Sequence, residues 1–223
     1  MNFFIFSEKL ATIKSDLLDF LFPLQERYQN ILFLKPEDIS TKTSSANTPP
    51  ISKTLSLFSY RDPIIHDLIW LIKYKNHKKA IRIAGELLYE HMVDLENDSL
   101  SLGNKKILIP MPCSRKRKKE KGFNQTEELC REVMNLGGKE FFVYLDNVLI
   151  KSKETPPQSH IKRRKERLDN PKDSFGVVDK EKIKGKKIIL FDDVVTTGAT
   201  LNEARRALKR AGAKDVFCIT LAH

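Results

Sequence analysis

The chain has 223 residues, 40% of them hydrophobic, a length that fits one sizeable core with an accessory segment. It has three cysteines, too few for a disulfide framework or a four-thiolate zinc site, which argues against a disulfide scaffold. No apolar run approaches the length of about 20 residues that a membrane span requires, which argues against a membrane-spanning protein. Lys and Arg outnumber Asp and Glu by 40 to 29, and the formal charge of +11 favours anionic ligands or partners.

The first 54 residues divide into two segments. Residues 1–34 carry apolar side chains at roughly helical spacing, which predicts a helical N-terminal extension that packs on the main domain; a helix that binds a partner or a membrane surface is the alternative. Acidic residues interrupt the apolar start where a signal peptide would be uniformly apolar, so a cytoplasmic location is expected. Residues 35–54 lack apolar periodicity and are rich in Ser, Thr and Pro, which predicts a linker or exposed loop.

From residue 55 onward, short apolar runs typical of buried strands alternate with helical patterns, among them helices at about 62–74 and 77–95. This alternation predicts an α/β domain with a central parallel sheet flanked by helices, whose ligand crevice lies beyond the carboxyl ends of the strands. A generic Rossmann-like domain is the alternative. The predicted strands are 55–60, 107–111, 141–145 with 147–150, 187–191 and 216–222.

The segment 186–213, KKIILFDDVVTTGATLNEARRALKRAGA, holds the most informative pattern. An apolar strand ends in Asp192 and Asp193, and a Thr- and Gly-rich turn then opens a helix that stops at Gly212. The free N–H groups of a helix N-terminus suit a phosphate, whereas the carboxylates suit sugar hydroxyls or a magnesium ion shared with ligand oxygens. The whole string predicts a ribose 5-phosphate site; an ordinary strand–turn–helix with a Thr cap is the alternative.

Within this segment, LFDDVVTTGAT resembles the phosphoribosyl pyrophosphate (PRPP) signature of type I phosphoribosyltransferases. The resemblance implies the type I phosphoribosyltransferase fold, an α/β architecture with a small hood drawn from about 55–75 and 113–125, and a phosphoribosyltransferase domain over 55–223. It implies that Asp192 and Asp193 contact the ribose, and that Mg²⁺ arrives with PRPP, with these two acids as the only expected protein ligands. The implied 5-phosphate contacts are Thr196, Thr197, Gly198, Ala199 and Thr200.

Three further segments, 60–80, 109–130 and 155–175, are similar to the ComF-type branch of that family, which comprises competence proteins. That branch often carries an N-terminal four-cysteine zinc module, but residues 1–54 contain no cysteine, so no zinc is expected. Lys121 stands where the branch usually has Arg, which keeps the charge but loses the bidentate fork. The similarity implies a pyrophosphate loop at Met111, Pro112, Cys113 and Ser114, and further motif positions at Lys73, Gly122, Phe123, Asn124, Gln125, Gln158 and Asn170.

Two runs of the chain are strongly cationic: residues 115–121 hold six Lys or Arg in seven positions, and residues 162–167 hold five in six. Three interpretations stay open for them, namely a solvated face, a grip on the pyrophosphate of PRPP, and electrostatic contact with a nucleic-acid backbone. Few aromatic residues lie between these cations, so a stacking platform for single strands has little support. The catalytic candidates are Arg115, Arg117, Lys121 and Arg167.

The expected activity is transfer of the 5-phosphoribosyl group from PRPP to an unidentified nitrogen acceptor, with release of pyrophosphate. The alternative, motivated by the ComF resemblance and the positive charge, is a non-catalytic competence factor that assists uptake of single-stranded DNA, with that DNA and competence-machinery proteins as partners. The sequence leaves open the acceptor, the oligomeric state and the role of residues 1–54.

Overall fold

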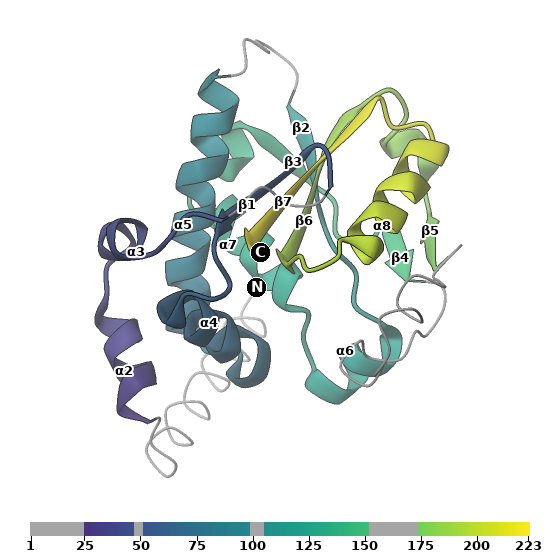
Figure 1. Cartoon of the computed structure of the whole chain (residues 1–223). Coiled ribbons are helices and arrows are strands. Elements are labelled where there is room, and N and C mark those ends of the chain that lie inside the picture. The colour runs from purple at the N-terminus through teal and green to yellow at the C-terminus, as the bar shows by residue number, and fades with distance from the viewer. Residues whose placement is uncertain (1–24, 47–50, 99–104, 152–173) are drawn as a thin grey trace, which may run out of the picture.

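The computed structural model describes residues 25–46, 51–98, 105–151 and 174–223 (Figure 1). The strands of its main sheet are β1 (Thr54–Phe58), β2 (Lys106–Pro110), β3 (Phe142–Tyr144), β6 (Lys187–Val194) and β7 (Asp215–Ala222). They form a five-stranded sheet in the order β1-β7-β6-β2-β3, in which every pairing is parallel. Apolar runs build the central strands because a parallel sheet is covered on both faces. The predicted α/β architecture is confirmed.

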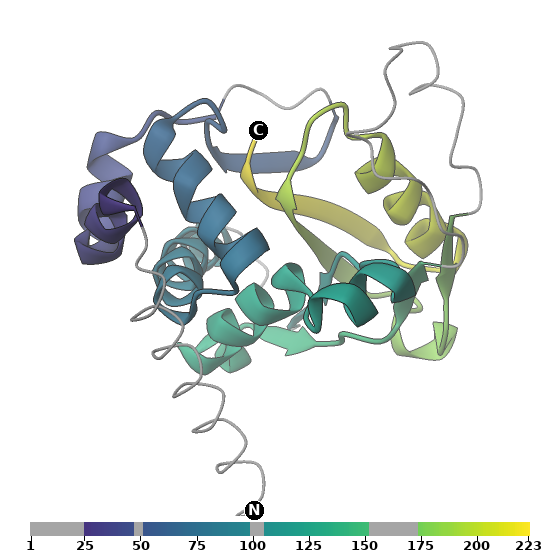
Figure 2. The same ribbon diagram turned by 90° about the horizontal axis from the view of Figure 1, so that it is seen from below.

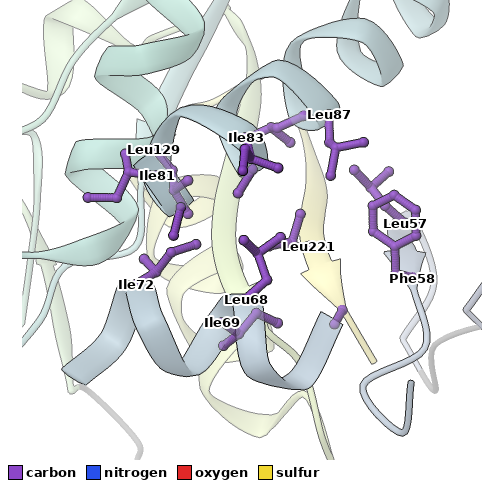
Figure 3. Close-up of a cluster of buried hydrophobic side chains, with 14 of the residues drawn as sticks. Leu57, Phe58, Leu68, Ile69, Ile72, Ile81, Ile83, Leu87, Leu129 and Leu221 are labelled. Carbon is purple, nitrogen blue, oxygen red and sulfur yellow. The ribbon is translucent and has the colours of Figure 1, made fainter. Parts of the chain in front are cut away.

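Helices cover both faces of this sheet (Figures 1 and 2). The helical elements of this part of the chain are α4 (Pro63–Trp70), the π-helix η1 (Leu71–Lys75), α5 (Lys78–Asp98), α6 (Arg115–Lys121), α7 (Gln125–Asn135), α8 (Ala199–Arg210) and the 3-10 turns η2 (Gly138–Glu140) and η4 (Lys180–Lys182). Alternate residues of β6 enter different cores: Ile189 and Phe191 pack with α4, α5 and α7 in the core that Figure 3 shows in part, whereas Ile188 and Leu190 pack with α8.

The N-terminal part contributes α2 (Glu26–Phe33) and α3 (Pro36–Lys42). The Tyr28 ring of α2 stacks on Trp70 of α4, with ring centroids 4.6 Å apart, which joins this part to the main core. The predicted linker at 35–54 is wrong over α3, where Pro36 occupies the first helical turn and Ile39 is fully buried. Of the predicted helical segment 1–34, residues 1–24 lie outside the described ranges.

Two placements differ from the sequence-based expectation. The run 147–150 does not join the parallel sheet, because β4 (Leu149–Lys151) pairs antiparallel with β5 (Phe175–Val177) in a separate two-stranded sheet. Leu149 and Phe175 are buried in the α8-side core, and this burial fixes the hairpin-like pair there. The hood was also expected to begin at 55, but β1 is an edge strand of the main sheet, in register with β7.

All five parallel strands end at the same edge of the sheet, and α6 lies beyond that edge (Figure 1). The connections that follow β2 and β6 therefore meet there, as expected for the ligand crevice of a parallel sheet. In the described ranges, no helix combines the length and the apolar character needed to cross a bilayer.

Candidate functional site

Two adjacent acids close to the carboxyl end of β6 form the centre of the site. Asp193 is buried, with 6% of its surface exposed, and Asp192 is half-buried. The Asp193 N–H donates a hydrogen bond of 2.9 Å to Asp192 Oδ1. Both acids lie inside β6 rather than after it, because β6 continues to Val194.

The Asp193 carboxylate has two donors on one oxygen. Asp193 Oδ2 lies 3.3 Å from Lys73 Nζ and accepts a hydrogen bond of 3.0 Å from Gln125 Nε2. Lys121 Nζ donates at 2.9 Å to the main-chain oxygen of Lys73 and lies 4.8 Å from the centre of the Tyr74 ring. The structure thus joins Lys73, Lys121 and Gln125 to the acid pair, with Lys121 engaged by η1.

The electrostatics of the two acids are unequal. Burial and the neighbouring Asp193 carboxylate raise the pKa of Asp192 to about 7, against the opposing effect of the Lys73 and Lys151 ammonium groups. Burial lowers the pKa of Lys73, but the carboxylates of Asp193 and Asp192 outweigh it and hold that pKa above its usual value. The Lys73 ammonium therefore contacts Asp193 near the end of β6 and acts on Asp192 electrostatically.

The predicted phosphate turn lies between β6 and α8. Thr196 and Thr197 are exposed, and Gly198 adopts a left-handed conformation (φ 72°) as the residue before α8. The Ala199 N–H points to Thr197 Oγ1 at 3.5 Å, and Ala199 and Thr200 begin the helix half-buried. The turn thus brings the first turn of α8 and the Thr196 and Thr197 side chains to one place, a setting of the kind in which helix N-termini bind phosphate.

The predicted pyrophosphate loop is held by the turn that precedes α7. Met111 O accepts hydrogen bonds from Asn124 Nδ2 at 3.1 Å and from Thr126 Oγ1 at 2.7 Å, while the Met111 N–H donates to Phe191 O of β6. Asn124 also caps α7, and Gly122 ends α6 in the left-handed region (φ 78°). The predicted pyrophosphate loop and the turn before α7 therefore pack against each other as one unit.

The rest of the predicted loop leads into α6. Pro112 is half-buried, and Ser114 caps α6 by accepting the Arg117 N–H at 3.2 Å. Cys113 is half-buried, and burial together with the Glu127 carboxylate raises the pKa of its thiol, which favours the protonated form. Phe123 is half-buried as well. This loop offers backbone donors rather than a thiolate.

The remaining candidates divide into three groups. Arg115 begins α6, and Arg117 lies on its exposed surface beyond the sheet edge. Burial, Arg117 and Lys73 together lower the pKa of Lys121. The candidates Gln158, Arg167 and Asn170 lie outside the described residues, as does the second cationic run.

Sequence reasoning missed Lys151, the last residue of β4. Its ammonium is half-buried, 6.0 Å from the Phe175 ring centre, and interacts electrostatically with Arg117, Asp192 and Cys113. Burial and Arg117 lower its pKa. A Lys directly after the apolar run NVLI was the available signal, but only the pairing of β4 with β5 brings it to the acids. Across the described ranges, no group of three or more His, Cys, Asp or Glu side chains could hold a metal ion.

Comparisons with known proteins bear on this arrangement. The phosphoribosyl transferase domain family matches residues 139–223, which include β6, the turn at Gly198, α8 and β7. Competence protein F of Haemophilus influenzae is 28% identical over 169 residues, 75% of this chain and 71% of that protein. Competence protein ComFC of Streptococcus pneumoniae is 38% identical over 113 residues, 51% of this chain and 46% of that protein.

Among solved structures, a hypoxanthine phosphoribosyltransferase from Trypanosoma cruzi in complex with the product IMP is 14% identical, with a TM-score of 0.40, over 64% of this chain and 62% of that one. The chain thus spans less than half of ComFC and less than two thirds of the solved enzyme. The parallel sheet carries the acid pair near the end of β6 inside a region that matches the phosphoribosyl transferase domain family, and the chain is similar to competence proteins of the ComF type.

Proposed function

We propose that the chain binds PRPP and transfers its 5-phosphoribosyl group to a nitrogen acceptor, releasing pyrophosphate. The observation that carries this proposal is the domain match over residues 139–223, because the matched part includes the acids of β6 and the turn that opens α8. The acids suit ribose hydroxyls, and the turn suits the 5-phosphate. A cytoplasmic location is part of the proposal.

In the proposed reaction, the bond between the anomeric carbon and the pyrophosphate oxygen breaks, and its electron pair leaves with pyrophosphate. The acceptor nitrogen forms the new bond to that carbon and loses a proton to solvent or to a nearby base. In this proposal the cations Lys73, Arg117 and Lys151 would stabilise the departing anion. The half-buried Asp192 carboxylate fits Mg²⁺, which prefers carboxylate and phosphate oxygens and would neutralise pyrophosphate charge when bound with PRPP.

The test of this proposal is calorimetric titration of PRPP with magnesium into the full chain, followed by a pyrophosphate-release assay with a panel of nucleobases and amines. We expect magnesium-dependent binding that the double variant Asp192→Asn/Asp193→Asn loses. Binding without release for every acceptor would retain the PRPP site and remove the transferase activity. No binding by the wild-type chain would overturn the proposal.

A second function is favoured by the surface of α6 and by the competence-protein relatives: assistance of DNA uptake through binding of single-stranded DNA. Lys116, Arg117 and Lys119 are exposed on α6. Tyr74, 63% exposed, lies under the Lys121 ammonium and beside Trp70, with ring centroids 5.8 Å apart. Exposed aromatic rings next to cations suit stacked bases and phosphates.

This second function predicts salt-sensitive binding of an oligothymidine probe. Neutralising Lys116, Arg117 and Lys119 together should weaken binding and reduce its salt dependence. The matched control neutralises three exposed lysines elsewhere, Lys180, Lys186 and Lys214. It should change the DNA affinity and its salt dependence only as much as the loss of net charge does. Equal effects of the two triple variants would reduce the binding to net charge, and no binding at low salt would remove the DNA function.

A further inference from the structure

We propose that the two adjacent acids have different roles: Asp193 is a positioning residue committed to holding Lys73, and Asp192 is the acid that meets the ligand. The inference rests on the proposed PRPP site for its ligand, but its structural part is independent of it. It departs from the resemblance, which assigns both acids to the ribose.

Side chains of the protein itself already bind the Asp193 carboxylate. Its side chain is enclosed, and Oδ2 receives both the Lys73 ammonium and the Gln125 amide. The orientation of that amide is determined, because a carboxylate accepts hydrogen bonds and only the Gln125 Nε2 end can donate one. A ligand hydroxyl that reached this oxygen would compete with two donors, the buried Gln125 amide and the partly exposed Lys73 ammonium.

Both the side chain and the main chain of Lys73 are held by contacts. Its ammonium contacts Asp193, and its main-chain oxygen accepts from Lys121 Nζ. It lies on the π-helix η1, an irregular turn that ends at Asn76 in the left-handed region (φ 49°). Asp193 and Lys121 therefore tie η1 to β6 and to the end of α6, and the position of the Lys73 charge depends on them.

The environment of Asp192 differs from that of Asp193. It is half-buried, and its Oδ1 accepts a hydrogen bond from the Asp193 backbone rather than from a side chain. The charged groups that face it are Asp193 on its own strand, Lys73 from η1 and Lys151 from β4. Two cations from two elements thus act electrostatically on the less enclosed acid, a setting that suits an anionic ligand with a hydroxyl.

The structural part is tested without ligand, by measuring the acetylation rate of Lys73 with acetic anhydride and peptide mass spectrometry. Lys75, exposed on the same π-helix, is the internal reference. The quantity compared is the ratio of the Lys73 acetylation rate to the Lys75 acetylation rate. We expect the increase of this ratio in Asp193→Asn to be at least three times the increase in Asp192→Asn. Gln125→Met removes no charge and leaves the ion pair of Lys73 with Asp193, so it is the control and should not raise this ratio. An equal effect of the two acid variants, or no effect of Asp193→Asn, would overturn the inference.

The ligand part is tested by calorimetry with PRPP and magnesium in a double-mutant cycle with Lys73→Met. If Asp193 acts through Lys73, the affinity loss caused by Asp193→Asn should fall to less than twofold in the Lys73→Met background. Asp192→Asn should cost at least tenfold in both backgrounds. An Asp193→Asn loss that persists without Lys73 would mean direct ligand contact and would overturn the division of roles. If the wild-type chain binds no PRPP, the proposed function fails, and the labelling result alone decides whether Asp193 positions Lys73.

Discussion

Gly198 and Ile51 are in direct contact across the start of α8: a Cβ atom on Gly198 would lie 1.7 Å from Ile51 Cδ1. Gly198 also has φ 72°, where a side chain is strained by about 1–2 kcal/mol. We therefore expect Gly198→Ala to lower the free energy of unfolding by at least about 2 kcal/mol and to weaken PRPP binding. Urea denaturation and calorimetry measure these two effects.

The matched control for this prediction is Gly185→Ala. Gly185 has φ 68° but is exposed, with no atom within 4 Å of an added Cβ, so it should show the backbone strain alone. Equal losses of stability at the two glycines would mean that the contact with Ile51 contributes nothing.

The raised pKa of Asp192 predicts how stability depends on pH. The folded protein holds this proton up to a pKa of about 7, whereas the unfolded chain loses it near pH 4, so the contribution of Asp192 to stability falls as pH rises between these values and is constant above them. Asp192→Asn should remove this decline. The variant should be more stable than wild type at pH 8, with a smaller difference at pH 5.

Asp215 supplies a control of opposite sign, because its hydrogen bond from Lys53 holds the pKa of that carboxyl below its usual range. Its stabilising contribution is present at neutral pH and is lost as pH falls through the folded-state pKa. Asp215→Asn should therefore be less stable than wild type at pH 7, with the difference shrinking in acid. A parallel pH response of the two variants in urea denaturation would contradict the assignment.

Asn124 both caps α7 and holds Met111, and two substitutions separate these tasks. Asn124→Ala should lower the free energy of unfolding by about 1–3 kcal/mol, because the cap and a buried donor are lost together. Asn124→Ser restores a cap acceptor but is too short to reach Met111 O. We expect it to be more stable than the Ala variant and still to bind PRPP more weakly than wild type, as measured by calorimetry.

Lys151 is expected to contribute to binding of the pyrophosphate group. Lys151→Met should weaken PRPP affinity about 10–100-fold, the range for loss of a hydrogen bond to a charged group, and should raise the pKa of Asp192, since the Lys151 ammonium opposes that shift. Lys180→Met, exposed on η4, is the control. Unchanged affinity in Lys151→Met would exclude this role.

The parts of the fold that sequence predicts are those determined locally. β6 and α8 follow from one unbroken apolar run, a Thr- and Gly-rich turn and a helical stripe, all within 28 consecutive residues. In contrast, α3 has seven residues with one buried side chain, Ile39, which leaves no periodicity to detect. The strands β4 and β5 have three residues each, and Gly176 interrupts the second, so their antiparallel pairing depends on burial against α8.

The candidate site follows the same rule. The acids and the turn at Gly198 are contiguous and were predicted together, but their partners are distant: the Gln125 amide that contacts Asp193 is 68 residues away in sequence. A motif can flag Lys73 and Gln125 as positions of interest without indicating that both converge on one carboxylate oxygen. Lys151 belongs to no motif, and tertiary packing alone brings it near Asp192.

The stack of Tyr28 on Trp70 makes the indole an optical reporter. The sequence contains a single tryptophan, so the intrinsic indole emission of this protein arises from one place. On one side of that indole lies the Tyr28 ring of α2, nearly parallel to it at an interplanar angle of 11°, and Tyr74, next to Lys73 on η1, also contacts it. Detachment of α2 or rearrangement of η1 would thus change the same emission band, which links the N-terminal helix and the candidate site in one spectrum.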